Sequence, residues 1–250
     1  SGEYHLAPSA DQLTQQQFGW WGAQFANPGA LVFDGVDDYV ELSQALNIFS
    51  SSFTIEMGVF HTAESRAILL GDYALSGAIN VNFEITADNK LRLHWAGSPD
   101  LRGVKTVPVD QWCNVAFVRD KVNNRVRFYL DGNLDLDYNG ALSDKVAVVP
   151  HRIGRDNRTG ETAFEGCMKY IRIWNRALSQ EEIRTYQHEE LTGDESGLIV
   201  YYKFDEGSGV TLHDHVQSND GVIYGPTWIK KGSFDPPYPT LTVRHLPRPI

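Results

Sequence analysis

Hydrophobic and polar residues alternate over many short stretches of this chain, and a period of two predicts β-strands rather than helices. In the stretch 53–60, FTIEMGVF, the large apolar residues occupy every second position, which predicts a strand with one face toward water. Turn-forming Gly, Asp, Asn and Pro residues separate such stretches. Further stretches of this kind lie at 30–35, 38–43, 67–73, 78–86, 90–97, 112–118 and 125–130. Many short strands between turns predict a β-sandwich or a jelly roll.

The period changes within the stretch 163–186. Residues 168–174 alternate like a half-buried strand, and Asn175 and Arg176 then turn the chain. Ser179, followed three residues later by Glu182, has the sequence signature of a capping box. We therefore predict a short helix through Tyr186, directly after a strand.

Two loops have a composition that predicts their geometry or their role. Asp131-Gly132 follows a strand and predicts a two-residue hairpin, because glycine adopts a positive φ at little cost. The stretch 154–160, GRDNRTG, is a long polar loop beside a strand. It is a candidate rim for a binding site.

Five motifs occur together, in an order that is specific: FDGVDDYVEL (33–42), SFTIEMGVF (52–60), WCNVAFVRD (112–120), VRFYLDGNL (126–134) and IRIWNRALSQEEI (171–183). In this order they resemble the laminin-G-like domains of bacterial surface proteins, members of the concanavalin A-like lectin/glucanase superfamily. The resemblance covers roughly residues 30–187. It implies an all-β, concanavalin A-like jelly-roll sandwich of two antiparallel sheets, with one short helix after the closing strand.

The segment after the helix departs from the order of that family. In the family a stretch like GLIVYYKFDEGSG (197–209) commonly precedes the FDGVDDYVEL strand, whereas here it follows. Either it begins a second repeat, or it folds back and takes the place of the missing N-terminal strand. We favour folding back, because the alternating Leu198, Val200, Tyr202 and Phe204 would otherwise expose an apolar face.

Three regions follow from this interpretation. Residues 29–232 are the laminin-G-like jelly roll, within which 195–230 supply the displaced edge strand. Residues 1–28 are an N-terminal extension that packs on the domain, because their aromatic residues are too apolar for a free linker. Residues 233–250 are a proline-rich tail that cannot form inner sheet.

Composition excludes several classes of partner. The formal net charge of −10 argues against nucleic acid and anionic membrane surfaces, which need clustered Lys and Arg. No run of about 18 apolar residues is present to form a transmembrane segment. Cys113 and Cys167 are too few for a disulfide scaffold, and their positions inside predicted strands favour two buried thiols. Ser1-Gly2 leaves a removed targeting segment open, and the resemblance implies a secreted or cell-surface location.

Catalysis and zinc binding find little support in the residue pattern. Some relatives of the fold are glucanases with closely spaced acidic residues on one strand face, and no such strand occurs here. Asp135 and Asp137 alternate, but they follow the hairpin tip, where solvated charges are expected. His213 and His215 could suit zinc, but no third ligand is identifiable, and a solvated strand end is the alternative.

Calcium is the metal that the oxygen-bearing turns would suit. The candidate ligands are Asp34, Asp37, Asp38, Asp214, Asn219 and Asp220. The resemblance implies a calcium ion beside the closing strand, held partly by an acidic residue at a position where this sequence has Lys169. An ammonium group there would repel a dication, so the resemblance supports calcium less strongly here than in a typical member.

Sugar binding needs aromatic faces and fixed polar groups, which several loops offer. The candidate ligand-binding residues are Asp72, Tyr73, Trp95, Arg102, Arg155, Asn157 and Arg158. We expect their loops to converge at one end of the sandwich. Trp95 is in phase with Leu91 and Leu93, so a core position is the alternative for this residue.

These observations predict a non-catalytic extracellular binding module whose partner is a glycan or a polysaccharide. A structural or spacer module, which braces neighbouring domains of a larger surface protein, is the rival hypothesis. A degenerate glycoside hydrolase is a third. Because a fold does not imply a function, the carbohydrate prediction depends largely on the resemblance.

Overall fold

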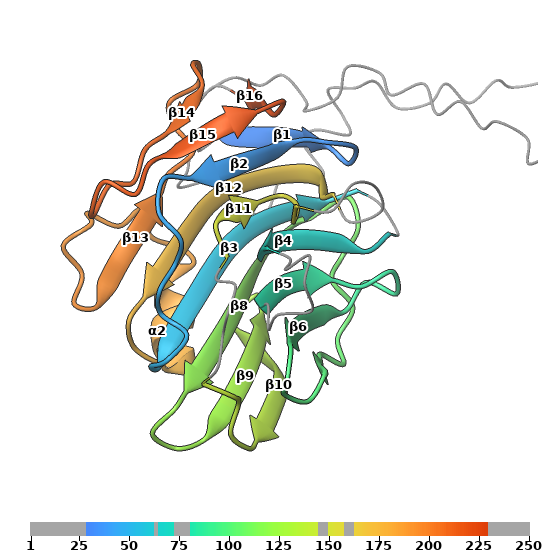
Figure 1. Cartoon of the computed structure of the whole chain (residues 1–250), viewed down its shortest axis with the longest axis vertical. Coiled ribbons are helices and arrows are strands. Elements are labelled where there is room, and N and C mark those ends of the chain that lie inside the picture. Colours follow the sequence, from blue (N-terminus) through green and yellow to red (C-terminus); the bar gives the residue numbers. More distant parts are fainter. Residues whose placement is uncertain (1–28, 63–64, 73–80, 145–149, 158–162, 230–250) are drawn as a thin grey trace, which may run out of the picture.

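The computed structural model describes residues 29–62, 65–72, 81–144, 150–157 and 163–229, which form two β-sheets stacked face to face (Figure 1). All pairings between the named strands are antiparallel. The expected all-β jelly-roll sandwich is confirmed.

The first sheet has the order β10-β9-β8-β3-β12-β1-β16, and β13 also pairs with β12. Its strands are β1 (Ala30–Asp34), β3 (Phe53–His61), β8 (Trp112–Asp120), β9 (Arg125–Leu130), β10 (Asn133–Asn139), β12 (Glu165–Trp174), β13 (Leu198–Tyr202) and β16 (Thr227–Ile229). The order of the second sheet is β14-β15-β2-β11-β4-β5-β6-β7. Its strands are β2 (Tyr39–Leu42), β4 (Ala67–Gly71), β5 (Val81–Ile85), β6 (Leu91–Trp95), β7 (Leu101–Arg102), β11 (Arg152–Ile153), β14 (Thr211–Leu212) and β15 (Gly221–Tyr224).

The main core lies between the two sheets and is rich in aromatic side chains. Trp95 is 1% exposed, stacks on Phe53 at a centroid distance of 6.3 Å and meets Phe49 edge to face. The guanidinium of Arg119 lies over its ring, 4.9 Å from the centroid. The prediction of Trp95 as a ligand-binding residue is therefore wrong, because its alternation with Leu91 and Leu93 points it into the core.

A second apolar cluster lies on the outer face of the first sheet, beneath the helix α2 (Gln180–Tyr186). The predicted capping box is present, because the side chains of Ser179 and Glu182 each accept a hydrogen bond from the other residue's backbone N–H. Trp174 of β12 stacks on Tyr186 at a centroid distance of 5.0 Å. The helix thus covers part of this face, together with the segment that follows it.

The predicted hairpin joins β9 to β10. Asp131 and Gly132 have φ values of 48° and 68°, and Leu130 pairs with Asn133. Two successive positive φ angles are typical of the type I′ turn, whose twist matches that of the flanking strands. Asp135, expected to be solvated, is instead only 7% exposed, because its Oδ1 accepts the N–H groups of Val104 and Lys105.

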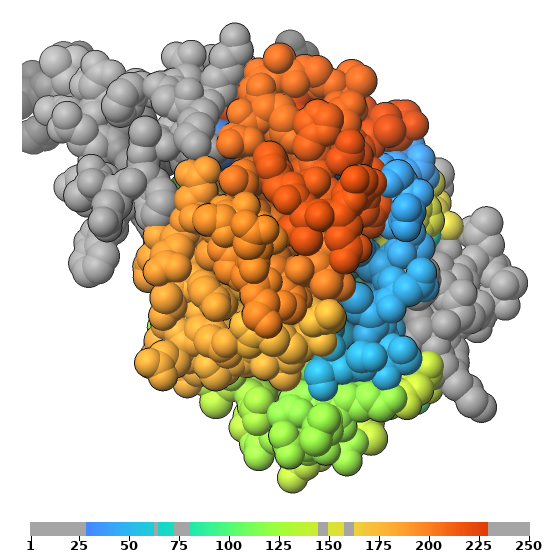
Figure 2. All heavy atoms as spheres, turned by 90° about the vertical axis from the view of Figure 1, so that its left-hand side faces the viewer, coloured from blue at the N-terminus to red at the C-terminus, as the bar shows by residue number. Residues whose placement is uncertain are grey.

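The segment after α2 contributes strands to both sheets. β13 pairs with β12, β15 pairs with β2, and β16 pairs with β1. In the space-filling view these C-terminal segments lie against the blue N-terminal strands and cover one side of the molecule (Figure 2). The chain from 195 to 229 therefore folds back on the domain. The expected extension, 1–28, and the tail, 233–250, lie outside the described residues.

Two features bear on the cellular setting. Cys113 and Cys167 are free and buried, and burial raises the pKa of the Cys167 thiol to about 12. Among the described residues, no helix has the length and apolar character needed to cross a bilayer.

Candidate functional site

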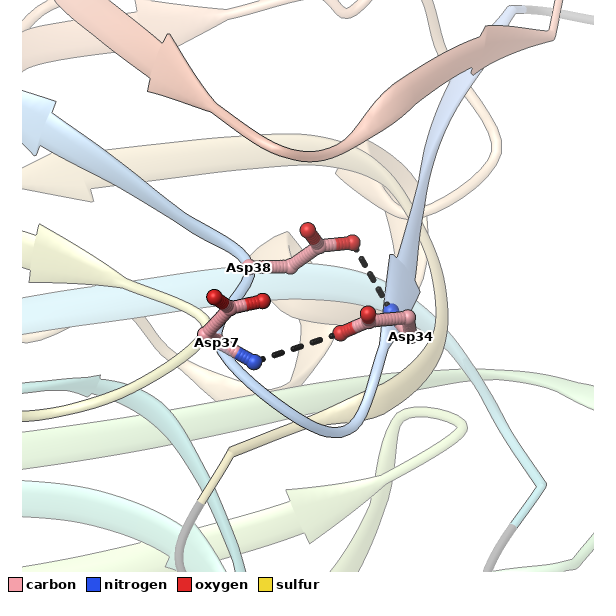
Figure 3. A group of neighbouring side chains, drawn as sticks. All are labelled: Asp34, Asp37 and Asp38. Atoms are coloured by element: carbon pink, nitrogen blue, oxygen red, sulfur yellow. Dashed lines mark hydrogen bonds between the residues drawn. The ribbon is translucent and has the colours of Figure 1, made fainter. Parts of the chain in front are cut away.

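The turn between β1 and β2 gathers three carboxylates, Asp34, Asp37 and Asp38, which we call the acidic turn (Figure 3). Asp34 ends β1, and its Oδ1 accepts hydrogen bonds from the N–H of Val36 at 2.8 Å and of Asp37 at 3.4 Å. The Oδ2 of Asp38 accepts the N–H of Asp34 at 2.9 Å. Short-range side-chain to backbone bonds of this kind are why Asp residues favour tight turns.

The acidic turn has a high density of negative charge. One oxygen of each of its three carboxylates lies within 4.8 Å of the others. The pKa of Asp38 is raised to about 6, chiefly by burial, with a smaller contribution from the negative charges of Asp34 and Asp37 and against the hydrogen bond from the Asp34 backbone. A cation at this turn would relieve the repulsion. Carboxylate oxygens on one short loop are also the donor type that calcium prefers, so the residues fit the ion.

The neighbours of the acidic turn do not include Lys169. The register pairs Asp34 with Glu165 of β12, and Lys169 lies four residues farther along that strand. The Lys169 ammonium instead sits over the ring of Trp112, 4.9 Å from the centroid. The ammonium group of Lys169 therefore lies away from the acidic turn, and its expected effect on an ion beside the closing strand stays a prediction.

The other predicted metal ligands hold a turn together instead. Both carboxylate oxygens of Asp214 accept backbone N–H groups, from Tyr201, Val216, Gln217 and Asn219. Asp220 accepts the N–H of Asp214 and contacts Nδ1 of His213 at 3.1 Å. Asn219 bonds with the segment that follows β2. These hydrogen bonds give Asp214, Asn219 and Asp220 a structural role in this turn, and their role as metal ligands stays a prediction.

Beside the acidic turn, two tyrosines and two arginines form what we call the tyrosine–arginine cluster. Tyr39 of β2 pairs with Tyr224 of β15, and their rings stack with centroids 4.8 Å apart and planes inclined by 16°. The guanidinium groups of Arg152 and Arg155 lie 5.0 and 5.5 Å from the centroid of the Tyr39 ring. Tyr224 is 43% exposed, so the cluster presents an aromatic surface to solvent.

Arg155 joins the cluster to the acidic turn. Its Nη1 donates to the backbone oxygen of Asp37 at 3.1 Å. Gly225, directly after Tyr224, approaches the carboxylate of Asp38 so closely that a Cβ there would collide with Oδ1. The acidic turn and the tyrosine–arginine cluster are therefore one continuous site.

A line of polar contacts continues from the cluster across the outer face of the second sheet. The Nη2 of Arg152 contacts Oε1 of Glu41 at 3.1 Å. The ring of His151 lies between two carboxylates, with Nε2 3.6 Å from Glu41 and Nδ1 2.5 Å from Oδ2 of Asp72. These contacts fix donors and acceptors beside an aromatic surface, which is the combination that sugar recognition needs.

The predicted ligand-binding residues do not converge at one end of the sandwich. Asp72 follows β4, whereas Arg155 and Asn157 follow β11. Because β4 and β11 are antiparallel neighbours, their C-terminal ends lie at opposite ends of the sheet. Arg102 is on β7, toward the end that carries Arg155. Tyr73 and Arg158 lie outside the described residues.

The sequence reasoning missed Tyr39, Tyr224, Glu41, His151 and Arg152. A signal existed for some of them, because Tyr39 and Glu41 alternate with the buried Val40 and Leu42 and must face outward. Tyr224 alternates in the same way on β15. Only the pairing of β2 with β15 brings the two tyrosines together.

Comparisons with known proteins address the fold and the family. A family model described as the concanavalin A-like lectin/glucanases superfamily matches residues 34–184. No curated protein matches the chain at a significant level.

Several solved structures share the fold at low sequence identity. A provisionally assigned carbohydrate binding protein from Bacteroides ovatus aligns with a TM-score of 0.65 and 20% identity, over 84% of this chain and 61% of that one. The CBM40 of the Ruminococcus gnavus IT-sialidase, bound to α2,3-sialyllactose, aligns with a TM-score of 0.52 and 18% identity, over 62% of this chain and 95% of that one. An SAP-like pentraxin from Limulus polyphemus aligns with a TM-score of 0.50 and 14% identity, over 64% of this chain and 81% of that one. The chain thus spans 61% of the length of the Bacteroides ovatus protein.

Proposed function

The chain belongs to the concanavalin A-like lectin/glucanases superfamily, and from this premise we propose that it is a non-catalytic carbohydrate-binding module of a secreted or cell-surface protein. The observation that carries the proposal is the stacked pair of Tyr39 and Tyr224 on the outer face of the second sheet, with Arg152 beside it. The names of two structural neighbours, the Bacteroides ovatus protein and the Ruminococcus gnavus CBM40, support a saccharide as the ligand.

Each residue of the site has a role that follows from its chemistry. The exposed Tyr224 offers a ring face on which the apolar side of a sugar can stack. Arg152 and Glu41, held in place by their ion pair, offer a donor and an acceptor for sugar hydroxyls. Tyr39, stacked beside Tyr224 on the neighbouring strand, limits the motion of the exposed ring. Such prior ordering reduces the entropy that binding costs.

A calcium ion at the acidic turn is the second part of the proposal. The three clustered carboxylates and the raised pKa of Asp38 support it. The ion would bind beside Arg155 and Tyr39, so that calcium would order the same corner of the sheet on which the sugar stacks.

A glycan-array screen of the purified chain, with and without calcium, tests the proposal. We expect at least one class of plant, microbial or host glycan to bind, and the hit to be confirmed by calorimetry with the free oligosaccharide. If no glycan binds at millimolar concentration, the spacer role is the better hypothesis. If the hit is cleaved during incubation, the chain is a hydrolase and the non-catalytic assignment is wrong.

A further inference from the structure

A second group of charged residues lies on the outer face of the second sheet, on strands away from the tyrosine–arginine cluster. Arg66 precedes β4, and Glu84, Arg92 and Arg102 lie on β5, β6 and β7. The registers pair Glu84 with Arg92 and Arg92 with Arg102. Directly paired residues point to the same face of a sheet, so these side chains are neighbours. We call Arg66, Arg92 and Arg102 the arginine cluster.

The arginine cluster shares two carboxylates. Glu84 is fully buried. Its carboxylate accepts hydrogen bonds from Nε of Arg66 at 2.6 Å and from Nη1 of Arg92 at 2.7 Å. The carboxylate of Asp100 accepts hydrogen bonds from Nε of Arg92 at 2.6 Å and from Nε of Arg102 at 3.2 Å. Three guanidinium groups therefore share two carboxylates, so within this group of described side chains one positive charge is in excess, in a chain whose net charge is −10.

The outer nitrogens of two of these arginines remain available. Arg66 and Arg102 use Nε for their ion pairs, and their Nη1 and Nη2 donate no hydrogen bond to any other residue in the described part of the chain. Their side chains are 31% and 50% exposed. A guanidinium whose Nη groups face solvent can bind a planar or tetrahedral oxyanion through two hydrogen bonds.

The local electrostatics agree with this interpretation. Arg92 and Arg102 are like charges at directly paired positions, and the Asp100 carboxylate that contacts both offsets only part of the positive charge that the two arginines and Arg66 bring together. His94 has a lowered pKa, chiefly because of burial and next because of the Arg92 charge, although Glu84 and Asp100 oppose the shift. At the adjacent turn, Asp88 and Lys90 carry opposite charges, so together they do not change the net charge of this region.

We propose that the arginine cluster binds the anionic group of an acidic saccharide, a carboxylate or a sulfate, and that it makes the module prefer acidic over neutral glycans. The inference rests on the proposed glycan-binding function and adds a charge-selective subsite to it. Tyr39 and Arg92 lie on the same sheet, with three strands between them. Four strand spacings are about 19 Å, which is within the length of an extended oligosaccharide.

The experiment uses matched pairs of oligosaccharides. Each acidic member, uronate-bearing or sulfated, is compared with its carboxyl-reduced or desulfated counterpart by calorimetry at low and high salt. The test variant is Arg66→Gln with Arg102→Gln. The matched control is Arg125→Gln with Arg127→Gln, which removes the same charge from β9 of the first sheet, where both arginines face Asp137.

We expect the wild type to bind the acidic member at least about ten-fold more tightly at low salt, and we expect salt to reduce this preference. The test variant should lose the preference and the control should keep it. The uronate and sulfate pairs identify the anion that is bound. Equal, salt-independent affinity for both members would overturn this inference while leaving glycan binding intact, as would a preference that survives in the test variant. Absence of binding to every saccharide would overturn the proposed function as well.

Discussion

The outer faces of the two sheets are built from the same alternation but end in different surroundings. On the first sheet the outward residues Trp174, Tyr170 and Tyr129 are covered by α2 and the segment after it. On the second sheet no helix of the described residues covers the outward residues Tyr39, Tyr224 and Arg152, and Tyr224 reaches solvent.

Charged groups behave differently on the two faces. Glu56 and Arg172 are paired in register beneath the helix, where Trp174 donates to Glu56 and Arg172 donates to the backbone oxygens of Tyr186 and Glu189. On the second sheet, Arg66, Arg102 and Arg152 keep part of their surface in water. The covered face uses its polar groups to fix the helix, and the open face keeps polar groups that a ligand can reach.

The largest expected effect is on the covered face. Trp174→Ala should lower the free energy of unfolding by about 3–5 kcal/mol, the usual cost of deleting a buried aromatic side chain. It also leaves the carboxylate of Glu56 without the indole hydrogen bond. Urea denaturation measures the loss. A loss below about 1 kcal/mol would show that α2 does not depend on this face.

The pH dependence of stability should reveal Glu56. Burial raises its pKa to about 7, against an attraction to Arg172, while in the unfolded chain its pKa is near 4.5. Because the pKa of Glu56 is higher in the folded than in the unfolded chain, its protonation stabilises the fold, and this contribution is fully present below pH 4.5. This stabilisation is lost as pH rises through about 7.

Glu56→Gln isolates that effect, because the other carboxylates cancel in the difference between wild type and variant. The variant should gain stability relative to wild type between pH 4.5 and 7, by an amount on the order of 3 kcal/mol. Parallel stability curves for the two proteins across this range would contradict the burial of a titrating Glu56.

Calcium should act at the acidic turn, beside the open face of the second sheet. If the acidic turn binds the ion, calcium at 100 times its Kd should stabilise the fold by about 2.7 kcal/mol. Asp37→Asn with Asp38→Asn should abolish this stabilisation, whereas Asp214→Asn should not, because the Asp214 oxygens accept backbone N–H groups. Thermal melts with calcium and with EDTA provide the measurement. An unchanged Tm in the wild type would remove calcium from the proposal.

Local signals in the sequence predicted the fold well. The capping box at Ser179 and the hairpin at Asp131-Gly132 each depend on residues next to one another, and both are present. Trp95 was ambiguous because alternation shows that a residue lies on one face without showing which face is buried. The site was harder to predict, since Tyr39 meets Tyr224 and Asp72 meets His151 only through strand pairing between distant segments.

The smallest expected change in stability belongs to the open face and accompanies the largest change in binding. Tyr224→Ala should change the free energy of unfolding by only about 0.5 kcal/mol, because a partly exposed side chain contributes little to the core. Leu134→Ala is the matched control, since Leu134 of β10 is similarly exposed but lies on the first sheet. A loss comparable to that of Trp174→Ala would place Tyr224 in the structural framework.

Calorimetric titration of wild type, Tyr224→Ala and Leu134→Ala with the oligosaccharide found in the array tests most directly whether the outer face of the second sheet binds glycan. The account predicts that Tyr224→Ala binds at least about ten-fold more weakly, a change of about 1.4 kcal/mol, because the stacking surface is gone. Leu134→Ala should bind like the wild type. Equal affinities for all three proteins would contradict the account and place the sugar elsewhere on the molecule.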